Sequence, residues 1–438
     1  MGHYDDGTRP AISLINIIAL PAHVRTCKEP LRPMIADTSR PAKQRAPDEL
    51  IKPYPDGGAV EGGKAPLSHV ALLFLRLGLT AFGGPAAHIA MMEDEVVRRR
   101  RWLTRQRFLD LLGAANLIPG PSSTEMAIYI GYTQAGWAGI ALVGACFILP
   151  AALITLGLAW AYLRFGHLPQ VGGILYGIKP VVIAIIAQAV WNLGRTAVKT
   201  HTHALVGLAA LTDAAITGRT VSILFGAGVL MLVCLALKSG LTPSHVSAIL
   251  IPSSLSRVLP VAALGAASLL SIFLMFFKIG ALVFGSGYVL LAFLKADLVD
   301  QRHWLTNAQL IDAVAVGQVT PGPVFTTATF IGYLLAGLPG ATLATLGIFL
   351  PGFLLVAASG PLIPWLRRSI VAGRFLDGVN VAALGLMAVV AWQLGRASIH
   401  DAGSAALAIL SAILLFRFRM PSYWLIALGA SAGFLLRM

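Results

Sequence analysis

The chain has 438 residues, of which 57% are hydrophobic and only 12% are charged. Soluble proteins carry about 25% charged residues, so this composition excludes an ordinary soluble domain and predicts a polytopic α-helical membrane protein. The net charge of +14 does not indicate nucleic-acid binding. Its basic residues cluster in short loops between apolar runs, where such residues orient membrane helices. Cys27, Cys146 and Cys234 fit no metal or disulfide spacing, and no cofactor is predicted.

Residues 1–66 are polar and rich in proline, glycine and mixed charge. We predict a disordered tail here and no signal peptide. The remaining chain is predicted to contain a first repeat at 67–240, a linker at 241–267 and a second repeat at 268–438.

The first predicted span begins near Ser68 and meets a helix-breaking Phe-Gly-Gly-Pro at 82–85. After the basic loop Arg98–Arg107, two apolar runs at 107–118 and 122–133 flank Pro-Gly-Pro at 119–121. Each run is about a dozen residues, too short to cross a ~30 Å hydrocarbon core at ~1.5 Å per residue. They are therefore predicted to form a re-entrant hairpin, with a new helix beginning at Ser122. Further spans or apolar runs are expected at 136–164, 171–195, 203–217 and 220–238.

The second half repeats the first at a constant offset of 202 residues, which becomes 201 after a one-residue deletion. Trp-Leu-Thr at 102–104 recurs at 304–306, and Pro-Gly-Pro at 119–121 recurs at 321–323. Identities at a fixed offset over so many positions indicate a duplication.

The two halves are predicted to be inverted with respect to the membrane, each with about five spans plus a re-entrant helical hairpin. The loop Arg98–Arg107 is strongly basic and its repeat at 295–307 is not. Such drift is what inversion under the positive-inside rule produces. The fold class is thus an all-α polytopic membrane protein of two homologous halves, with its absolute orientation left open.

The two Pro-Gly-Pro breaks are the principal candidate site. A helix that begins inside the membrane presents free N–H groups and the positive end of its dipole, which suit an oxyanion. The alternative is that Pro-Gly-Pro only kinks a helix and the hydroxyls cap it. The candidate substrate-binding residues at the breaks are Asn116, Gly120, Ser122, Ser123, Thr124, Gln318, Gly322, Thr326 and Thr327.

Arg76 and Lys278 align with each other inside apolar spans, where a cation is expensive and often marks a pathway. Snorkelling to an interface is the alternative. Gly83 and Gly84, with Gly285 in the repeat, could unwind the first helix of each half and expose amides, or could serve close helix packing.

Glu125 is the lone carboxylate at a break and a candidate for proton coupling; its repeat partner is Thr327. Asp110 and Asp312 align near the hairpin entrance and are expected to pair with neighbouring basic residues, while His88 is interpreted as an ordinary interior residue. No nucleotide loop, metal cluster or catalytic residue is predicted.

Several of these motifs together resemble the chromate ion transporter family. They are Phe-Gly-Gly-Pro-Ala at 82–86, Arg-Trp-Leu at 101–103, Leu-Ile-Pro-Gly-Pro at 117–121, Tyr-Ile-Gly-Tyr at 129–132 and Phe-Ile-Leu-Pro at 147–150. The resemblance covers about residues 68–438 and implies proton-motive-force-dependent export of chromate, conferring resistance, with sulfate as the structural analogue. Many family members read Pro-Gly-Pro-Glu-Ala at the first break, whereas here Ser122, Ser123 and Thr124 precede Glu125.

The sequence therefore predicts a chromate transporter, and no enzyme, in the bacterial plasma (inner) membrane. Its partners would be a chromate or sulfate-like oxyanion and the lipid bilayer, with a homodimer left open. One alternative is a transporter of sulfate or another anion. Another is a membrane-embedded polyprenyl diphosphate phosphatase, whose loop resembles residues 118–123 but needs an arginine where Ser123 stands.

Overall fold

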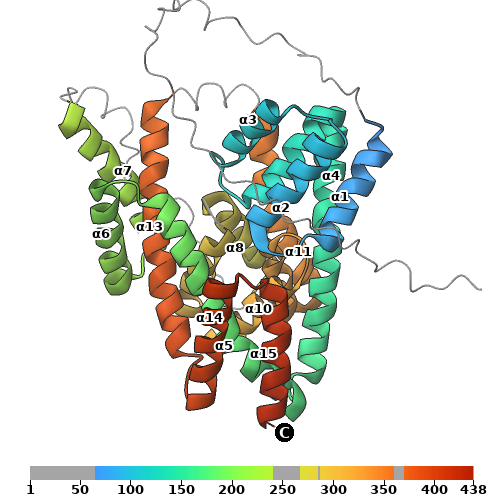
Figure 1. Cartoon of the computed structure of the whole chain (residues 1–438), viewed down its shortest axis with the longest axis vertical. Coiled ribbons are helices and arrows are strands. Elements are labelled where there is room, and N and C mark those ends of the chain that lie inside the picture. Colours follow the sequence, from blue (N-terminus) through green and yellow to red (C-terminus); the bar gives the residue numbers. More distant parts are fainter. Residues whose placement is uncertain (1–64, 240–266, 285–286, 360–368, 438) are drawn as a thin grey trace, which may run out of the picture. The chain divides into compact units, whose positions relative to one another are not determined.

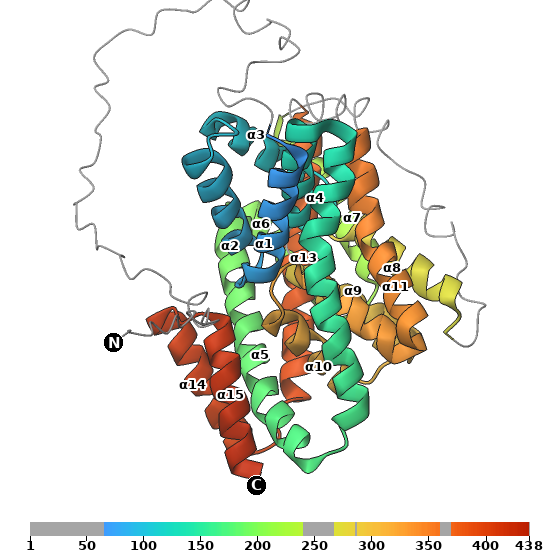
Figure 2. The ribbon, with the colours of Figure 1, turned by 90° about the vertical axis from the view of Figure 1, so that its right-hand side faces the viewer.

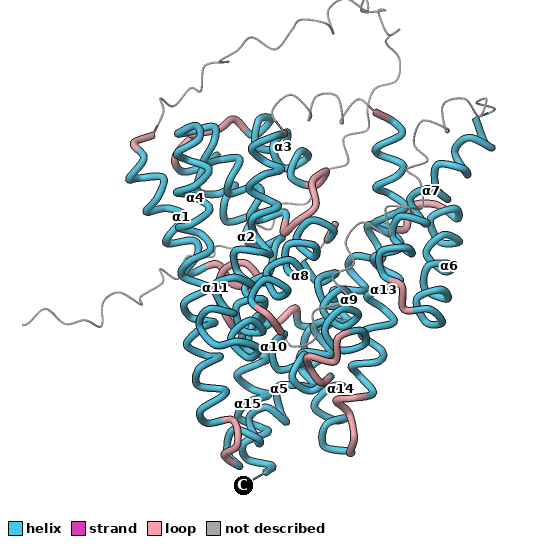
Figure 3. Tube along the Cα trace, turned by 180° about the vertical axis from the view of Figure 1, so that it is seen from behind, coloured by secondary structure: helices cyan, strands magenta, loops and turns pink. Residues whose placement is uncertain are grey.

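A computed structural model describes residues 65–239, 267–284, 287–359 and 369–437. These residues form helices joined by short loops, and no strand occurs among them (Figure 3). Five helices are long and apolar enough to cross a membrane, which confirms the predicted all-α membrane class. The predicted tail at 1–66 and the linker at 241–267 lie almost wholly outside the described residues.

The two halves contain the same succession of elements. The first half has α1 (Leu67–Thr80), α2 (Gly84–Glu93), the π-helix η3 (Asp94–Arg99), α3 (Arg105–Ala115), α4 (Ser122–Phe165), α5 (Pro169–Ala197), α6 (His201–Thr217) and α7 (Thr220–Ser239). The second half has α8 (Leu269–Leu282), η8 (Gly287–Val289), α9 (Leu290–Leu294), the π-helix η9 (Lys295–Gln301), α10 (Asn307–Val319), η10 (Val324–Thr326), α11 (Thr327–Ala358), α13 (Ile370–Arg396), α14 (Ala402–Phe418) and α15 (Ser422–Arg437).

Each half begins with a half-length hairpin that the sequence did not predict. Helix α1 has 14 residues and is therefore ~21 Å long, short of a ~30 Å core. The chain then turns at Gly83, whose φ of 105° is readily adopted only by glycine, and returns as α2 (Figure 1). Residues 68–80 are thus one arm of a hairpin and do not cross on their own.

The second hairpin follows the prediction. Helix α3 ends at Ala115 and α4 begins at Ser122, so the Pro-Gly-Pro stretch is the break that the sequence indicates. The continuous helix α4 contains a sharp turn at Ala135 and Gly136, whose φ is 60°. The part before this turn is the returning arm, and the part after it is a full span. Helix α11 has the same turn at Ala336 and Gly337.

The long helices of the two halves run in opposite directions. Figure 2 shows the second part of α4 descending to join α5, which rises beside it. In Figure 1, α13 descends from the top of the view while its counterpart α5 rises. The halves also exchange partners: α6 and α7 of the first half pack on α13, whereas α14 and α15 of the second half pack on α5. This arrangement fits two homologous, inverted halves that are interlocked.

Glycines allow these exchanged helices to approach closely, as is usual in membranes. A Cβ on Gly177 of α5 would collide with the carbonyl of Gly429 in α15. By contrast, a Cβ on Gly172, one and a half turns earlier in α5, would meet nothing within 4 Å.

Gly177→Ala is expected to lower the midpoint of thermal unfolding in detergent, because overpacking a tight contact costs ~1–3 kcal/mol. Gly172→Ala is the matched control and should leave the midpoint unchanged or raise it, since alanine favours helix by ~1 kcal/mol. Equal midpoints for the two variants would contradict the close α5–α15 contact at Gly177.

Candidate functional site: the paired helix breaks

The breaks of the two halves are joined by a reciprocal pair of backbone hydrogen bonds. The Gly120 N–H donates to the Val283 carbonyl at 2.7 Å, and the Gly322 N–H donates to the Ala81 carbonyl at 2.8 Å. Gly120 corresponds to Gly322 by the repeat, and Ala81 corresponds to Val283. Each Pro-Gly-Pro break is therefore bonded to the break after α1 or α8 of the opposite half.

The hydroxyls of Ser122, Ser123 and Thr124 at the start of α4 do not cap the helix. Its N-cap residue is Pro121, and no side chain caps the helix. Ser122, Ser123 and Thr124 are all buried, and the Thr124 hydroxyl has no hydrogen-bond partner among the described residues. The capping alternative raised by the sequence therefore does not describe this end, where the first-turn N–H groups and three hydroxyls lie close together.

The second break uses its hydroxyls locally. Thr326 Oγ1 donates to the Pro323 carbonyl at 2.9 Å, and Thr327 Oγ1 donates to the Val324 carbonyl at 2.8 Å. Thr155 of α4 lies 3.4 Å from the hydroxyls of both Thr320 and Thr326. The hydroxyls of Thr326 and Thr327 therefore already have hydrogen-bond partners, in contrast to the hydroxyl of Thr124 at the first break.

Glu125 is fully buried in the first break, and neither carboxyl oxygen has a hydrogen-bond partner among the described residues. The carboxyl lies between Gly120 and Gly352, since a Cβ on either glycine would collide with it. An ionised carboxylate is costly in such a place unless it gains partners.

Gly352 makes the room for this carboxyl. The equivalent residue of the first half is Ala151, which lies against Gly322, and the equivalent of Glu125 is the smaller Thr327. A large acid and a glycine in one half therefore stand at the positions that a small alcohol and an alanine occupy in the other.

His88 of α2 connects three parts of the first break. Its Nε2 lies 3.1 Å from the Ala81 carbonyl and its Nδ1 lies 3.4 Å from Ser123 Oγ. A neutral ring with the proton on Nε2 donates to the carbonyl and accepts from the hydroxyl. The sequence interpretation of His88 as an ordinary interior or interfacial residue agrees with its burial, but it did not include these two contacts. The available signal was that the repeat has Leu290 at the same position.

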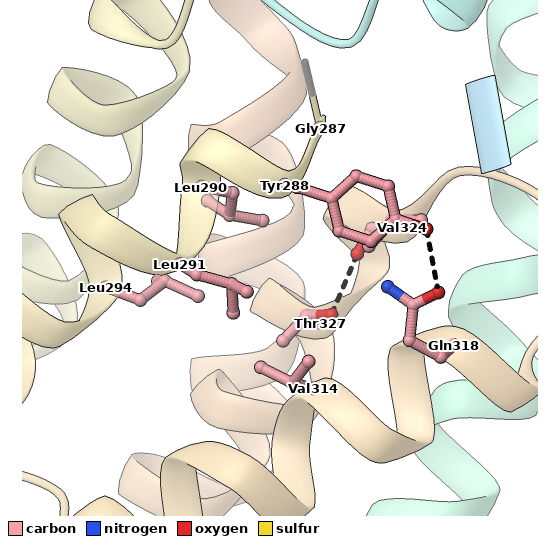
Figure 4. Close-up of a pocket in the computed structure, with 9 residues that line it drawn as sticks. All are labelled: Gly287, Tyr288, Leu290, Leu291, Leu294, Val314, Gln318, Val324 and Thr327. Carbon is pink, nitrogen blue, oxygen red and sulfur yellow. Dashed lines mark hydrogen bonds between the residues drawn. The ribbon is translucent and has the colours of Figure 1, made fainter. Parts of the chain in front are cut away.

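The predicted residues Gln318 and Thr327 line a small cavity beside the second break, together with Tyr288 (Figure 4). Tyr288 donates to Gln318 Oε1 at 3.5 Å, and Gln318 Nε2 has no partner among the described residues. The cavity volume of about 10 Å³ accommodates one water molecule at most. A tetrahedral oxyanion does not fit here unless the hairpin opens.

The aligned cations Arg76 and Lys278 are not brought together with the break residues by any described contact. Arg76 is exposed on α1. Lys278 Nζ lies 2.7 Å from Asp297 Oδ1, so its charge is already balanced. The counterpart of Asp297 is Glu95, which pairs with arginines of its own loop instead. A substrate role for Arg76 or Lys278 remains a prediction.

The remaining predicted site residues lie in different places. Asn116 is the exposed C-cap residue of α3, and Gly285 lies outside the described residues. Gly83 and Gly84 form the turn between α1 and α2, and a Cβ on Gly84 would lie 3.6 Å from the Tyr288 hydroxyl of the other half.

Comparison with known proteins decides the family. The model of the chromate transporter family matches residues 68–242 and again residues 270–434. The chain belongs to the chromate transporter family.

Curated relatives agree with this assignment. A chromate transport protein of Cupriavidus metallidurans is 37% identical over 83% of this chain and 92% of its own length. A probable chromate transport protein of Synechococcus elongatus is 34% identical over 84% of this chain and 95% of its own length. An uncharacterized transporter of Methanocaldococcus jannaschii is 26% identical over 80% of this chain. No solved structure matches.

Membership of this transporter family also bears on the phosphatase alternative. The relatives are named transport proteins, and the position that would need an arginine holds Ser123, which bonds His88. The geometry at the first break therefore gives no support to diphosphate hydrolysis.

Gly352→Ala is expected to lower the amount of folded transporter in the membrane and its unfolding midpoint, because the new Cβ would fall 2.7 Å from Glu125 Oε1. Adding Glu125→Thr, which reproduces the combination found in the other half, should restore much of this loss. Thermal unfolding of the single and double variants in detergent measures the coupling. Additive effects would show that Gly352 does not accommodate Glu125.

Proposed function

We propose that this transporter exports chromate across the bacterial inner membrane, driven by the proton motive force, and thereby confers chromate resistance. The observation that carries the proposal is the first break: an uncapped helix start with buried hydroxyls, beside a buried carboxyl whose oxygens have no hydrogen-bond partner among the described residues. The dianion would bind the N–H groups of Ser122 and Ser123 and the hydroxyls of Ser122, Ser123 and Thr124, at the positive end of the helix dipole. The Thr124 N–H already donates to the Pro121 carbonyl.

The membrane potential alone favours this direction. An inside-negative potential of 100 mV contributes ~2.3 kcal/mol per charge moved outward, hence ~4.6 kcal/mol for a dianion. Export therefore needs no ATP.

Glu125 would link a proton to the anion. An ionised carboxylate at the first break would repel the bound dianion, so anion binding favours the neutral acid. One proton then accompanies each chromate, and a net charge of about −1 moves outward. The electrical part of the proton motive force still drives this outward cotransport of chromate and a proton.

Everted membrane vesicles test the function directly. Energised vesicles containing the chain should accumulate chromate, with competition by sulfate because it is also a tetrahedral dianion. Valinomycin with potassium, which collapses the potential, should stop uptake, whereas nigericin, which collapses only the pH gradient, should not. Vesicles lacking the chain are the control. Absence of chromate flux in both vesicle orientations would refute the proposal, and sulfate flux alone would make sulfate the substrate.

Glu125→Gln keeps a neutral side chain of nearly the same shape, so chromate flux should persist while the accompanying proton movement disappears. A pH-sensitive dye inside everted vesicles measures that movement after a chromate pulse. Glu93→Gln is the control, because Glu93 lies in surface ion pairs with Arg98 and Arg105, outside the break. Unchanged proton movement in Glu125→Gln would exclude Glu125 as the coupling group.

A further inference from the structure

The two halves are in different conformational states, although their elements correspond one to one. Every residue of α9 is buried, and so are Leu310–Ala315 of α10. Among the equivalent residues of α2 and α3, more than half are exposed or only partly buried. Ile311 is 1% exposed, for example, while its counterpart Leu109 is 45% exposed.

The difference arises from what covers each hairpin. Helix α10 packs against α5, α11 and α15, whereas the principal neighbour of α3 is α4 of its own half. The second-half hairpin is therefore closed by helices of both halves, and the small cavity beside Gln318 lies within this closed side (Figure 4).

A polar cluster holds the closed side together. Lys179 Nζ of α5 lies 3.2 Å from Asp312 Oδ1 of α10, and the Tyr162 hydroxyl at the end of α4 donates to Asp312 Oδ2 at 3.0 Å. The Lys179 and Asp312 side chains are 24% and 4% exposed, so water screens this ion pair only weakly. Breaking the pair would leave a buried charge without its partner, which is strongly unfavourable.

The equivalent positions on the other side differ in charge. Asp110 corresponds to Asp312, but Asn380 stands where Lys179 would be. Gln106 Nε2 of the same helix lies 3.5 Å from Asp110 Oδ1. An amide can hydrogen-bond a carboxylate but cannot neutralise it, so closure on this side would be less stable.

We propose that Lys179, Tyr162 and Asp312 form the gate of an alternating-access cycle, and that the structure shows the state in which this gate is closed. In the opposite state α10 leaves α5, the Lys179–Asp312 pair separates, and α3 closes towards α13 so that Asp110 meets Asn380. Inverted repeats permit this exchange, because each half can adopt the conformation of the other. The proposal rests on the transport function proposed above, but its test does not involve chromate.

The test compares two cysteines at corresponding positions, introduced separately into a chain whose three native cysteines are replaced. One variant is Val314→Cys on α10, where the native valine is 2% exposed. The other is Leu112→Cys at the corresponding position of α3, where the native leucine is partly exposed. Reaction with a water-soluble maleimide in detergent should be slow at position 314 and faster at position 112.

Asp312→Asn in each of these chains should accelerate labelling at position 314 by about tenfold and slow it at position 112. The pair Asp110→Cys and Asn380→Cys should form a disulfide cross-link only when Asp312→Asn is also present. Exchanging the charges by Lys179→Asp with Asp312→Lys should restore slow labelling at 314. Acceleration at both 112 and 314 would indicate local unfolding and overturn the gate, as would unchanged labelling at 314. Chromate flux can fail independently of these results.

Discussion

The reciprocal hydrogen bonds between the breaks constrain everything else in this transporter. Backbone groups released inside a membrane must find partners within the protein. Here the Gly120 N–H finds a carbonyl after α8, and the Gly322 N–H finds a carbonyl after α1. Both glycines have positive φ angles, of 135° and 87°, which turn these amides towards the opposite half. The fold therefore needs two halves, since neither half alone supplies the acceptor that its own break needs.

This symmetric frame carries an asymmetric site. The second break has Thr327, Ala151 and a cluster of hydroxyls that bond one another or nearby carbonyls. The first break has Glu125, Gly352 and hydroxyls that do not cap their helix. One break can thus remain a packed structural joint while the other carries specificity and coupling, and no position has to serve both purposes.

The sequence alone predicted those features that depend on local chemistry or on the repeat. Proline and glycine mark the helix breaks, and the fixed offset reveals the halves, so the break at 119–121 and the new helix at Ser122 were correctly placed. The hairpin of α1 and α2 was missed because a 14-residue apolar arm followed by a glycine turn has the same composition as the start of a span.

Ion pairs between residues far apart in the chain could not be predicted from the sequence. Asp312 was expected to pair with a neighbouring basic loop, but its partner is Lys179, which is far away in the chain and on the other half. Likewise, the sequence did not predict the ion pair of Lys278 with Asp297 of the π-helix η9, and a substrate role for Lys278 remains a prediction. Neither choice of partner is encoded by spacing along the chain.

These pairings explain how a transporter with several lysines near its core can release a dianion. Lys179, Lys278 and Lys295 are each matched by a carboxylate, namely Asp312, Asp297 and Asp300. In the mechanism proposed above, the anion meets helix-end dipoles and hydroxyls, which would attract it without the strength of a fixed unpaired charge. Transport requires binding that is favourable enough for entry and weak enough for exit. A protonated Glu125 would preserve that balance on binding, and its ionisation after the break opens would help to expel the anion.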